Sequence, residues 1–108
     1  MDNYFEKLKL IADGLNEKYP GGNEPFQIIT RLCEESGELA KAVNHFEDSG
    51  SKVKKYGQPN KKELAKEVQD VIRSAMQVAA YYEMEKELEK SIDERMENLK
   101  KDGFIKEK

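Results

Sequence analysis

Apolar side chains recur every three or four residues along most of the chain. They form three runs: Phe5, Leu8, Ile11 or Ala12, and Leu15; then Phe26, Ile29, Leu32 or Cys33, Ala40 and Val43; then Leu64, Val68, Val71 or Ile72, Ala75, Ala79 and Tyr82. This spacing places each run on one face of an α-helix. The sequence has no convincing alternating run of β-branched and aromatic residues bounded by turns, so it offers little for a β-sheet. The pattern therefore predicts an all-α fold.

Proline and glycine mark where the first two helices end. The first helix is expected over about 3–18, stopped by Tyr19-Pro20-Gly21-Gly22. The second is expected from Pro25, a residue suited to a first helical turn, to Phe46. Residues 47–60 are polar and contain glycine and proline, so we expect a linker there.

The remainder of the chain predicts two more helices. Asn60 followed by Glu63 resembles a capping arrangement at the start of the third helix. Residues 61–101 contain no glycine or proline, and an unbroken helix of that length would span about 60 Å. The apolar stripe falters between Tyr82 and Leu88, so a break near 83–86 is more economical. We therefore expect a bundle of four helices.

Length and composition limit the organisation of the chain and its partners. A chain of 108 residues suits a single domain over 1–108, in which 102–108 reads as a frayed tail. The net charge of -3 lacks the basic excess of a nucleic-acid-binding protein. No apolar run approaches the roughly 18 residues that span a bilayer. The single cysteine, Cys33, cannot form an internal disulfide. We expect a soluble, cytoplasmic protein that binds neither nucleic acid nor membranes.

Two acid pairs carry the most chemical information. Glu35 and Glu38 lie three residues apart on the second helix, and Glu67 and Asp70 lie three residues apart on the third. That spacing puts each pair on one helix face, at the border of the apolar stripe. Four carboxylates brought together by helix packing repel one another unless protons or a cation compensate. A hard divalent cation such as Mg²⁺ or Mn²⁺ resolves this conflict, and an ordinary charged surface is the alternative.

Two other site chemistries fit the sequence less well. Ferritin-like di-iron sites use Glu-x-x-His pairs, and His45, the one histidine, has no glutamate three residues before it. No segment resembles the glycine-rich loop that P-loop NTPases use to bind phosphates, which argues against that class. Lysines in and near the linker could face phosphates, although a solvated charge run is the simpler interpretation.

The acidic segments resemble a known enzyme family. Residues 32–43 (LCEESGELAKAV), 67–72 (EVQDVI) and 77–82 (QVAAYY) look like the MazG-like all-α nucleoside triphosphate pyrophosphohydrolases. The shared pattern is Glu-x-x-Glu, a spacer of 28 residues here, and then Glu-x-x-Asp, and the resemblance covers roughly 19–101. It implies a dimeric or tetrameric enzyme that uses Mg²⁺ to convert a nucleoside triphosphate to the monophosphate and pyrophosphate. It also suggests removal of non-standard nucleotides as the cellular purpose. Because Mn²⁺ also prefers oxygen ligands, we expect it as a possible substitute.

The resemblance also implies roles for individual residues. Glu35, Glu38, Glu67 and Asp70 correspond to the metal ligands. Hydrolysis also needs an acid that orients the attacking water, and we expect either Glu35 or Glu38 in that role. A second, weaker match lays Arg95, Asn98 and Lys101 on the phosphate-contacting residues of the family's last helix. An exposed helix end, in which cations complement the helix dipole, is the alternative for these three.

Two other functions are also compatible with the sequence, as alternatives to the enzyme that the resemblance implies. In the first, the acids pair with lysines in a non-catalytic helical oligomer that acts as a scaffold or regulator. In the second, a small metal-binding bundle senses nucleotides without hydrolysing them. The sequence assigns no nucleobase-stacking residue among its aromatic side chains, which include Tyr19, Phe26, Phe46, Tyr56, Tyr81 and Tyr82.

Overall fold

A computed structural model describes residues 3–48 and 51–106. These residues form five helices, which are α1 (Tyr4–Lys18), α2 (Pro25–Phe46), α3 (Lys52–Tyr56), α4 (Lys61–Tyr81) and α5 (Glu85–Lys101). The described part of the chain contains no strand, which confirms the all-α prediction. Four helices are long, as expected, and the fifth, α3, is a short helix inside the segment expected to be a linker.

Local hydrogen bonds explain where the long helices begin. The Asn3 side-chain oxygen accepts a hydrogen bond from the Glu6 amide at 3.0 Å, and Asn60 does the same for Glu63 at 2.8 Å. Both bonds satisfy amides that have no partner within the helix. Pro25 occupies the first turn of α2, where its missing N–H removes no helical hydrogen bond. The start of α4 is the one that the Asn60 and Glu63 spacing predicts.

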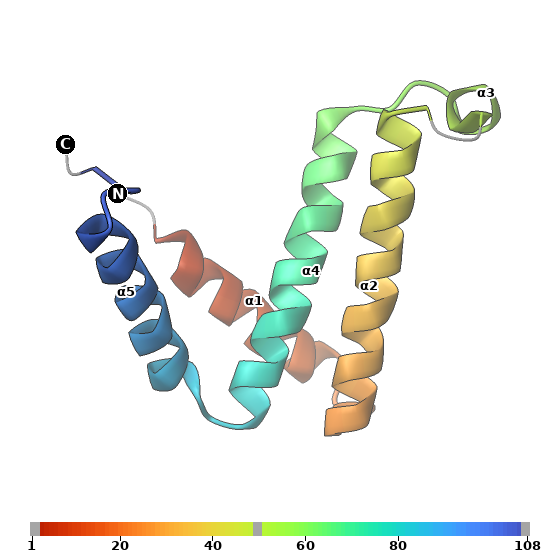
Figure 1. Cartoon of the computed structure of the whole chain (residues 1–108). Helices are drawn as coiled ribbons and strands as arrows, with labels where there is room; N and C mark the ends of the chain where they lie inside the picture. Colours follow the sequence, from red (N-terminus) through yellow and green to blue (C-terminus); the bar gives the residue numbers. More distant parts are fainter. Residues whose placement is uncertain (1–2, 49–50, 107–108) are drawn as a thin grey trace.

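The break between α4 and α5 falls where the apolar stripe falters. Glu83 adopts a left-handed backbone conformation with φ of 52°. The Met84 amide then donates to the Ala79 carbonyl at 2.9 Å, which closes the end of α4. A left-handed residue followed by such a bond is a common way for a helix to end without glycine or proline. The chain reverses here and α5 leads away from α4 (Figure 1).

The short helix α3 is fastened to the end of α2. The Val53 amide donates to the Asp48 carboxylate at 3.0 Å, and His45 Nε2 lies 2.7 Å from the Gly57 carbonyl oxygen. A carbonyl can only accept, so the His45 Nε2–H is the donor in this bond. His45 thus joins the last turn of α2 to the residue that follows α3.

The packed part of the protein is built on α4. Helices α2 and α4 run antiparallel and side by side, and α1 crosses α4 on another face (Figure 1). The buried apolar side chains among the described residues are Ala12, Ile28, Met76 and Ala79. These residues come from α1, α2 and α4, so the core lies where those three helices meet. Helix α5 contributes none of them.

A chain of polar side chains, centred on the buried Gln77, connects α1 with α4. Gln77 is only 2% exposed, and its Nε2 donates to Asn16 Oδ1 at 3.2 Å. The Arg73 guanidinium donates to Gln77 Oε1 at 3.3 Å. Both ends of the buried amide are therefore satisfied, as burial of a polar group requires. This chain leads from α1 to Arg73, close to the acidic residues of α4.

The fold leaves much apolar surface uncovered. The radius of gyration is 17.0 Å, whereas a compact chain of this length has about 13 Å. The accessible surface is 8618 Å², against about 6,200 Å² for a compact monomer of this mass. Large exposed apolar side chains include Leu10, Phe26, Ile29, Val43, Val68, Ile72, Ile92, Met96 and Phe104. The fold of one chain thus leaves these apolar faces in contact with solvent.

The residues after α5 fold back on the end of that helix. After α5, the amides of Phe104 and Ile105 donate to the Leu99 carbonyl at 2.9 and 3.3 Å, so residues to 105 fold back on the helix end. The last two residues of the expected frayed tail lie outside the described residues.

Among the described helices, none combines the length and apolarity that crossing a membrane requires. The single domain over 1–108 stays a prediction.

Candidate functional site

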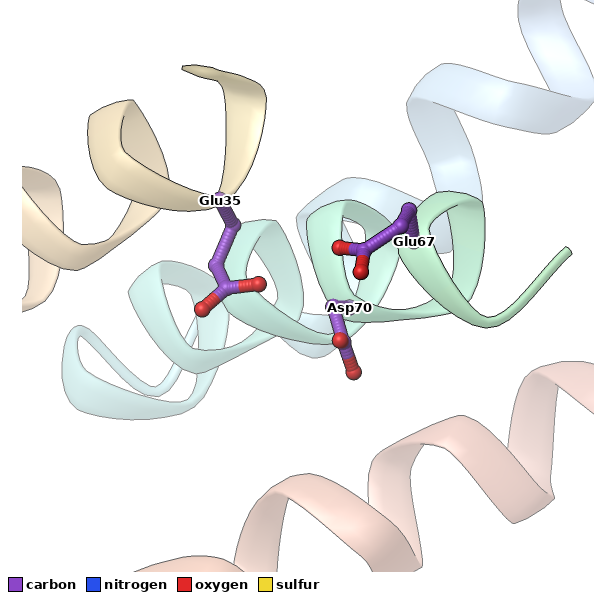
Figure 2. Close-up of side chains that lie close together, drawn as sticks. All are labelled: Glu35, Glu67 and Asp70. Carbon is purple, nitrogen blue, oxygen red and sulfur yellow. The ribbon is translucent and has the colours of Figure 1, made fainter. Parts of the chain in front are cut away.

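Three of the four predicted metal ligands meet between α2 and α4. Glu35 projects from α2, and Glu67 and Asp70 project from successive turns of α4 (Figure 2). One carboxylate oxygen of each lies within 4.8 Å of the other two, and all three residues are partly buried. We call these three residues the acid group. The antiparallel packing of α2 on α4 brings together the two acid pairs, which are far apart in the sequence.

The fourth predicted ligand, Glu38, lies outside the acid group. It is one helical turn from Glu35 on α2, and its side chain is 55% exposed. Its Oε1 lies 3.9 Å from Lys41 Nζ. The spacing of three residues correctly predicts a shared helix face, but the angle at which α2 crosses α4 decides which glutamate approaches Glu67 and Asp70. Glu38 borders the same pocket as Glu67 instead.

Two cations accompany the acid group. Lys66 Nζ lies 3.4 Å from Asp70 Oδ2, and an Arg73 guanidinium nitrogen lies 3.6 Å from Asp70 Oδ1. The two side chains differ in environment, because Lys66 is 71% exposed and Arg73 only 14%. Neither Lys66 nor Arg73 was predicted from the sequence. The signal was present, since they lie four residues before and three after Asp70, on the same helix face.

A pocket of about 490 Å³ opens beside the acid group. Its floor and walls come from the last turns of α2, from α3 and from the first turns of α4. The size suits a small molecule, and the lining combines carboxylates, lysines and apolar rings. The lining residues include Glu38, Lys41, His45, Phe46, Lys52, Tyr56, Leu64, Lys66 and Glu67. The α2–α4 pocket therefore shares Glu67 with the acid group.

The end of the pocket at α3 is electropositive. Lys52 Nζ and Lys55 Nζ lie 5.9 and 5.1 Å from the centroid of the Tyr56 ring. The Lys55 ammonium beside Tyr56 holds the pKa of that phenol below its ordinary value, and Lys52 and Lys41 act in the same direction. Cations near a phenol favour its charged form. The same field favours any anion that enters this end of the pocket.

The structure places Arg95, Asn98 and Lys101 away from the acid group. All three lie exposed on α5, which diverges from α2 and α4 after the turn that follows α4 (Figure 1). Asn98 and Lys101 border a shallow depression together with Glu97, Lys100 and Ile105. Within one chain these residues therefore do not face the α2–α4 pocket.

Comparisons with known proteins identify no relative: no family model, no curated protein and no solved structure matches the chain. The residues themselves define a small all-α protein with a group of three acids that could hold a metal ion, beside a pocket of small-molecule size.

Proposed function

We propose that the protein is a Mg²⁺-dependent nucleoside triphosphate pyrophosphohydrolase, which converts an NTP or dNTP and water to the monophosphate and pyrophosphate. The observation that carries the proposal is the acid group of Glu35, Glu67 and Asp70 at the edge of the α2–α4 pocket. The resemblance of the two acidic segments to MazG-like enzymes supports the same activity. Removal of non-standard nucleotides is the cellular role that we propose with it.

The donor set of the acid group fits a hard divalent cation. Oxygen ligands around Mg²⁺ are separated by about 3.0 to 4.2 Å, given metal–oxygen distances of about 2.1 Å. The three carboxylate oxygens lie within 4.8 Å of one another, so small side-chain rotations would bring them into that range. Mn²⁺ has the same ligand preference. When bound, the cation supplies charge neutralisation for the phosphates and lowers the pKa of a coordinated water.

The chain's own residues would divide the remaining tasks. Glu38 lies outside the acid group but on the pocket wall, so we assign it the water-orienting role in preference to Glu35. Phe46 and Tyr56 offer flat apolar surface at the α3 end of the pocket, where a nucleobase would stack. The lysines that line the pocket would stabilise the negative charge of the leaving pyrophosphate.

We also propose that the enzyme is a homodimer or homotetramer. The accessible surface exceeds that of a compact monomer by about 2,400 Å², which is the amount that an obligate interface removes from one chain. A second copy is the partner that a symmetric assembly provides for these apolar faces. In such an assembly α5 of one chain would cover α2 and α4 of another and bring Arg95, Asn98 and Lys101 to its pocket. Sedimentation velocity tests this, since a single species of 12.5 kDa would contradict it.

Release of pyrophosphate from a panel of standard and modified NTPs and dNTPs tests the activity. The panel is run with Mg²⁺ and with EDTA, on the wild type, Glu67→Gln, Glu38→Gln and Glu34→Gln. We expect Mg²⁺-dependent release by the wild type and Glu34→Gln, and at least a hundredfold loss in the other two. Glu34 is the matched control because it is exposed and next to Glu35 but outside the acid group. Absence of release from every nucleotide by a folded, metal-bound wild type would contradict the proposal.

One observation favours a non-catalytic function. Asp70 and Glu38 already have cationic partners in Lys66, Arg73 and Lys41. In a scaffold or regulator these ion pairs would be the final state of the acids, and Mg²⁺ would not bind. Calorimetric titration with Mn²⁺ separates the two functions before any substrate is known. A nucleotide sensor would bind metal and triphosphate but release no pyrophosphate.

A further inference from the structure

Two lysines both pair with acids of the site and line the α2–α4 pocket. Lys66 Nζ lies 3.4 Å from Asp70 Oδ2, and Lys41 Nζ lies 3.9 Å from Glu38 Oε1. Their side chains are 71% and 64% exposed, and both form part of the pocket wall. Ion pairs between such exposed side chains are weak, so each lysine can leave its carboxylate at little cost.

Arg73 behaves differently from the two lysines. It is 14% exposed, lies 3.6 Å from Asp70 and donates a hydrogen bond to the buried Gln77. Gln77 in turn donates to Asn16 of α1. A planar guanidinium held at both ends has less freedom to change partner than a lysine ammonium on a flexible stem. Arg73 is therefore the permanent counter-ion of Asp70, whereas Lys66 is an exchangeable one.

The charges determine what happens when a cation binds. A divalent cation and Arg73 together balance the three negative charges of the acid group. Lys66 then has no carboxylate charge left to compensate, and it is repelled by the cation beside it. Lys41 lies across the pocket on α2 and loses its own partner if Glu38 turns toward a water. Both ammonium groups would then lie on the pocket wall without a carboxylate to pair with.

We propose that Lys41 and Lys66 bind the polyphosphate chain of the ligand in the α2–α4 pocket, exchanging their carboxylate partners for phosphate oxygens once a divalent cation occupies the acid group. The inference rests on the proposed function for the metal and adds the ligand class of the pocket, a linear polyphosphate. It predicts opposite effects of one substitution. Removing the lysine charge strengthens binding of the cation alone and weakens binding of the cation with polyphosphate.

Calorimetry on the full chain tests this with two probes, Mn²⁺ alone and inorganic tripolyphosphate in the presence of Mg²⁺. The variants are Lys66→Gln and Lys41→Gln, and the matched control is Lys62→Gln, an exposed lysine of α4 outside the pocket wall. Lysine and glutamine have similar helix propensities, so circular dichroism should show unchanged folding. We expect Lys66→Gln to bind Mn²⁺ about two- to fivefold more tightly and tripolyphosphate roughly tenfold more weakly. Lys41→Gln should mainly weaken tripolyphosphate binding, because Glu38 is outside the acid group.

The outcomes separate this inference from the proposed function. Tripolyphosphate affinities of Lys66→Gln and Lys41→Gln equal to that of Lys62→Gln would overturn the inference, even if the wild type releases pyrophosphate. A wild type that binds tripolyphosphate through both lysines but hydrolyses no nucleotide would overturn the enzymatic activity and support the lysine roles. A purely structural role for Lys66 would not shift the two affinities in opposite directions, so a parallel loss of both also contradicts the exchange.

Discussion

Neutralising one member of the acid group should make the metal-free protein more stable and the metal-loaded protein less stable. The perturbation is Glu35→Gln, which keeps the size of the side chain and removes its charge. Two like charges 4.8 Å apart repel by about 0.9 kcal/mol in water, and by less at physiological salt. Glu35 has two such neighbours, Glu67 and Asp70, but Lys66 and Arg73 already offset much of the Asp70 charge. The expected gain in unfolding free energy is therefore about 0.5–1 kcal/mol.

The metal reverses this order. A cation present at one hundred times its dissociation constant stabilises the folded wild type by about 2.7 kcal/mol. Glu35→Gln loses an anionic ligand and should gain far less from the same concentration. In EDTA the variant is expected to melt roughly 2–8 °C above the wild type, and in Mg²⁺ or Mn²⁺ below it. This reversal, in which the variant melts above the wild type in EDTA and below it in metal, is specific to a carboxylate that is both repelled by its neighbours and used to hold a cation.

Thermal unfolding followed by circular dichroism at 222 nm measures the melting temperatures of the wild type and the variant in EDTA and in metal. One protein concentration is used throughout, so that any assembly contributes equally. Glu34→Gln is the control, because it removes the same charge from the adjacent exposed position of α2. It should follow the wild type in EDTA and in metal. If Glu35→Gln is less stable than Glu34→Gln in EDTA, or keeps the full rise with metal, the reasoning about the acid group is wrong.

Three further predictions concern the fold and the pocket. Ile28→Ala should lower the unfolding free energy by about 2–5 kcal/mol, because Ile28 is only 3% exposed. Urea denaturation measures this difference, and a decrease of less than about 1 kcal/mol would show that Ile28 is not a core residue. Asn60→Ala should cost about 1 kcal/mol by removing the cap of α4, while Asn60→Asp should retain most of the stability. Tyr56 should ionise at a lower pH than Tyr81, since lysines lower the pKa of Tyr56 whereas burial and the nearby Glu24 raise the pKa of Tyr81. Absorbance titration at 295 nm of Tyr56→Phe and Tyr81→Phe checks the order, and Lys55→Gln should raise the pKa of Tyr56.

The sequence predicts the long helices well because their signals are local. Pro25, Phe46 and the Asn60 cap lie at the predicted ends, and the break after Tyr81 falls beside the predicted gap in the apolar stripe. Helix α3 was not predicted, since five residues give no apolar period to detect. It depends on contacts made outside itself, from Asp48 to the Val53 amide and from His45 to Gly57.

The acid group could be predicted only in part for a similar reason. Spacing within a helix shows that Glu67 and Asp70 share a face, and that Glu35 and Glu38 share another. Which glutamate of α2 meets α4 depends on the rotation and crossing of two helices, a property of packing that no spacing records. The structure brings Glu35 to the group and leaves Glu38 on the pocket wall. The distance of Arg95, Asn98 and Lys101 from the acids could not be predicted for a related reason. Helix α5 packs little against the other helices of its own chain, so its position does not follow from helix spacing.

The placement of the acid group on α2 and α4 has a physical logic. Carboxylates that repel one another spread apart unless their backbones are held, and these two helices form the most extensively packed pair in the chain. The hydrogen bonds that join Asn16, the buried Gln77 and Arg73 connect α1 with α4, and Arg73 places a positive charge beside Asp70. Two exposed lysines lie near the acid group: Lys66 pairs with Asp70 of the group, and Lys41 pairs with Glu38, which lies outside it. In the proposed function, a divalent cation would bind this group first and a polyanion second, because the bound cation would create the positive field that the polyanion requires.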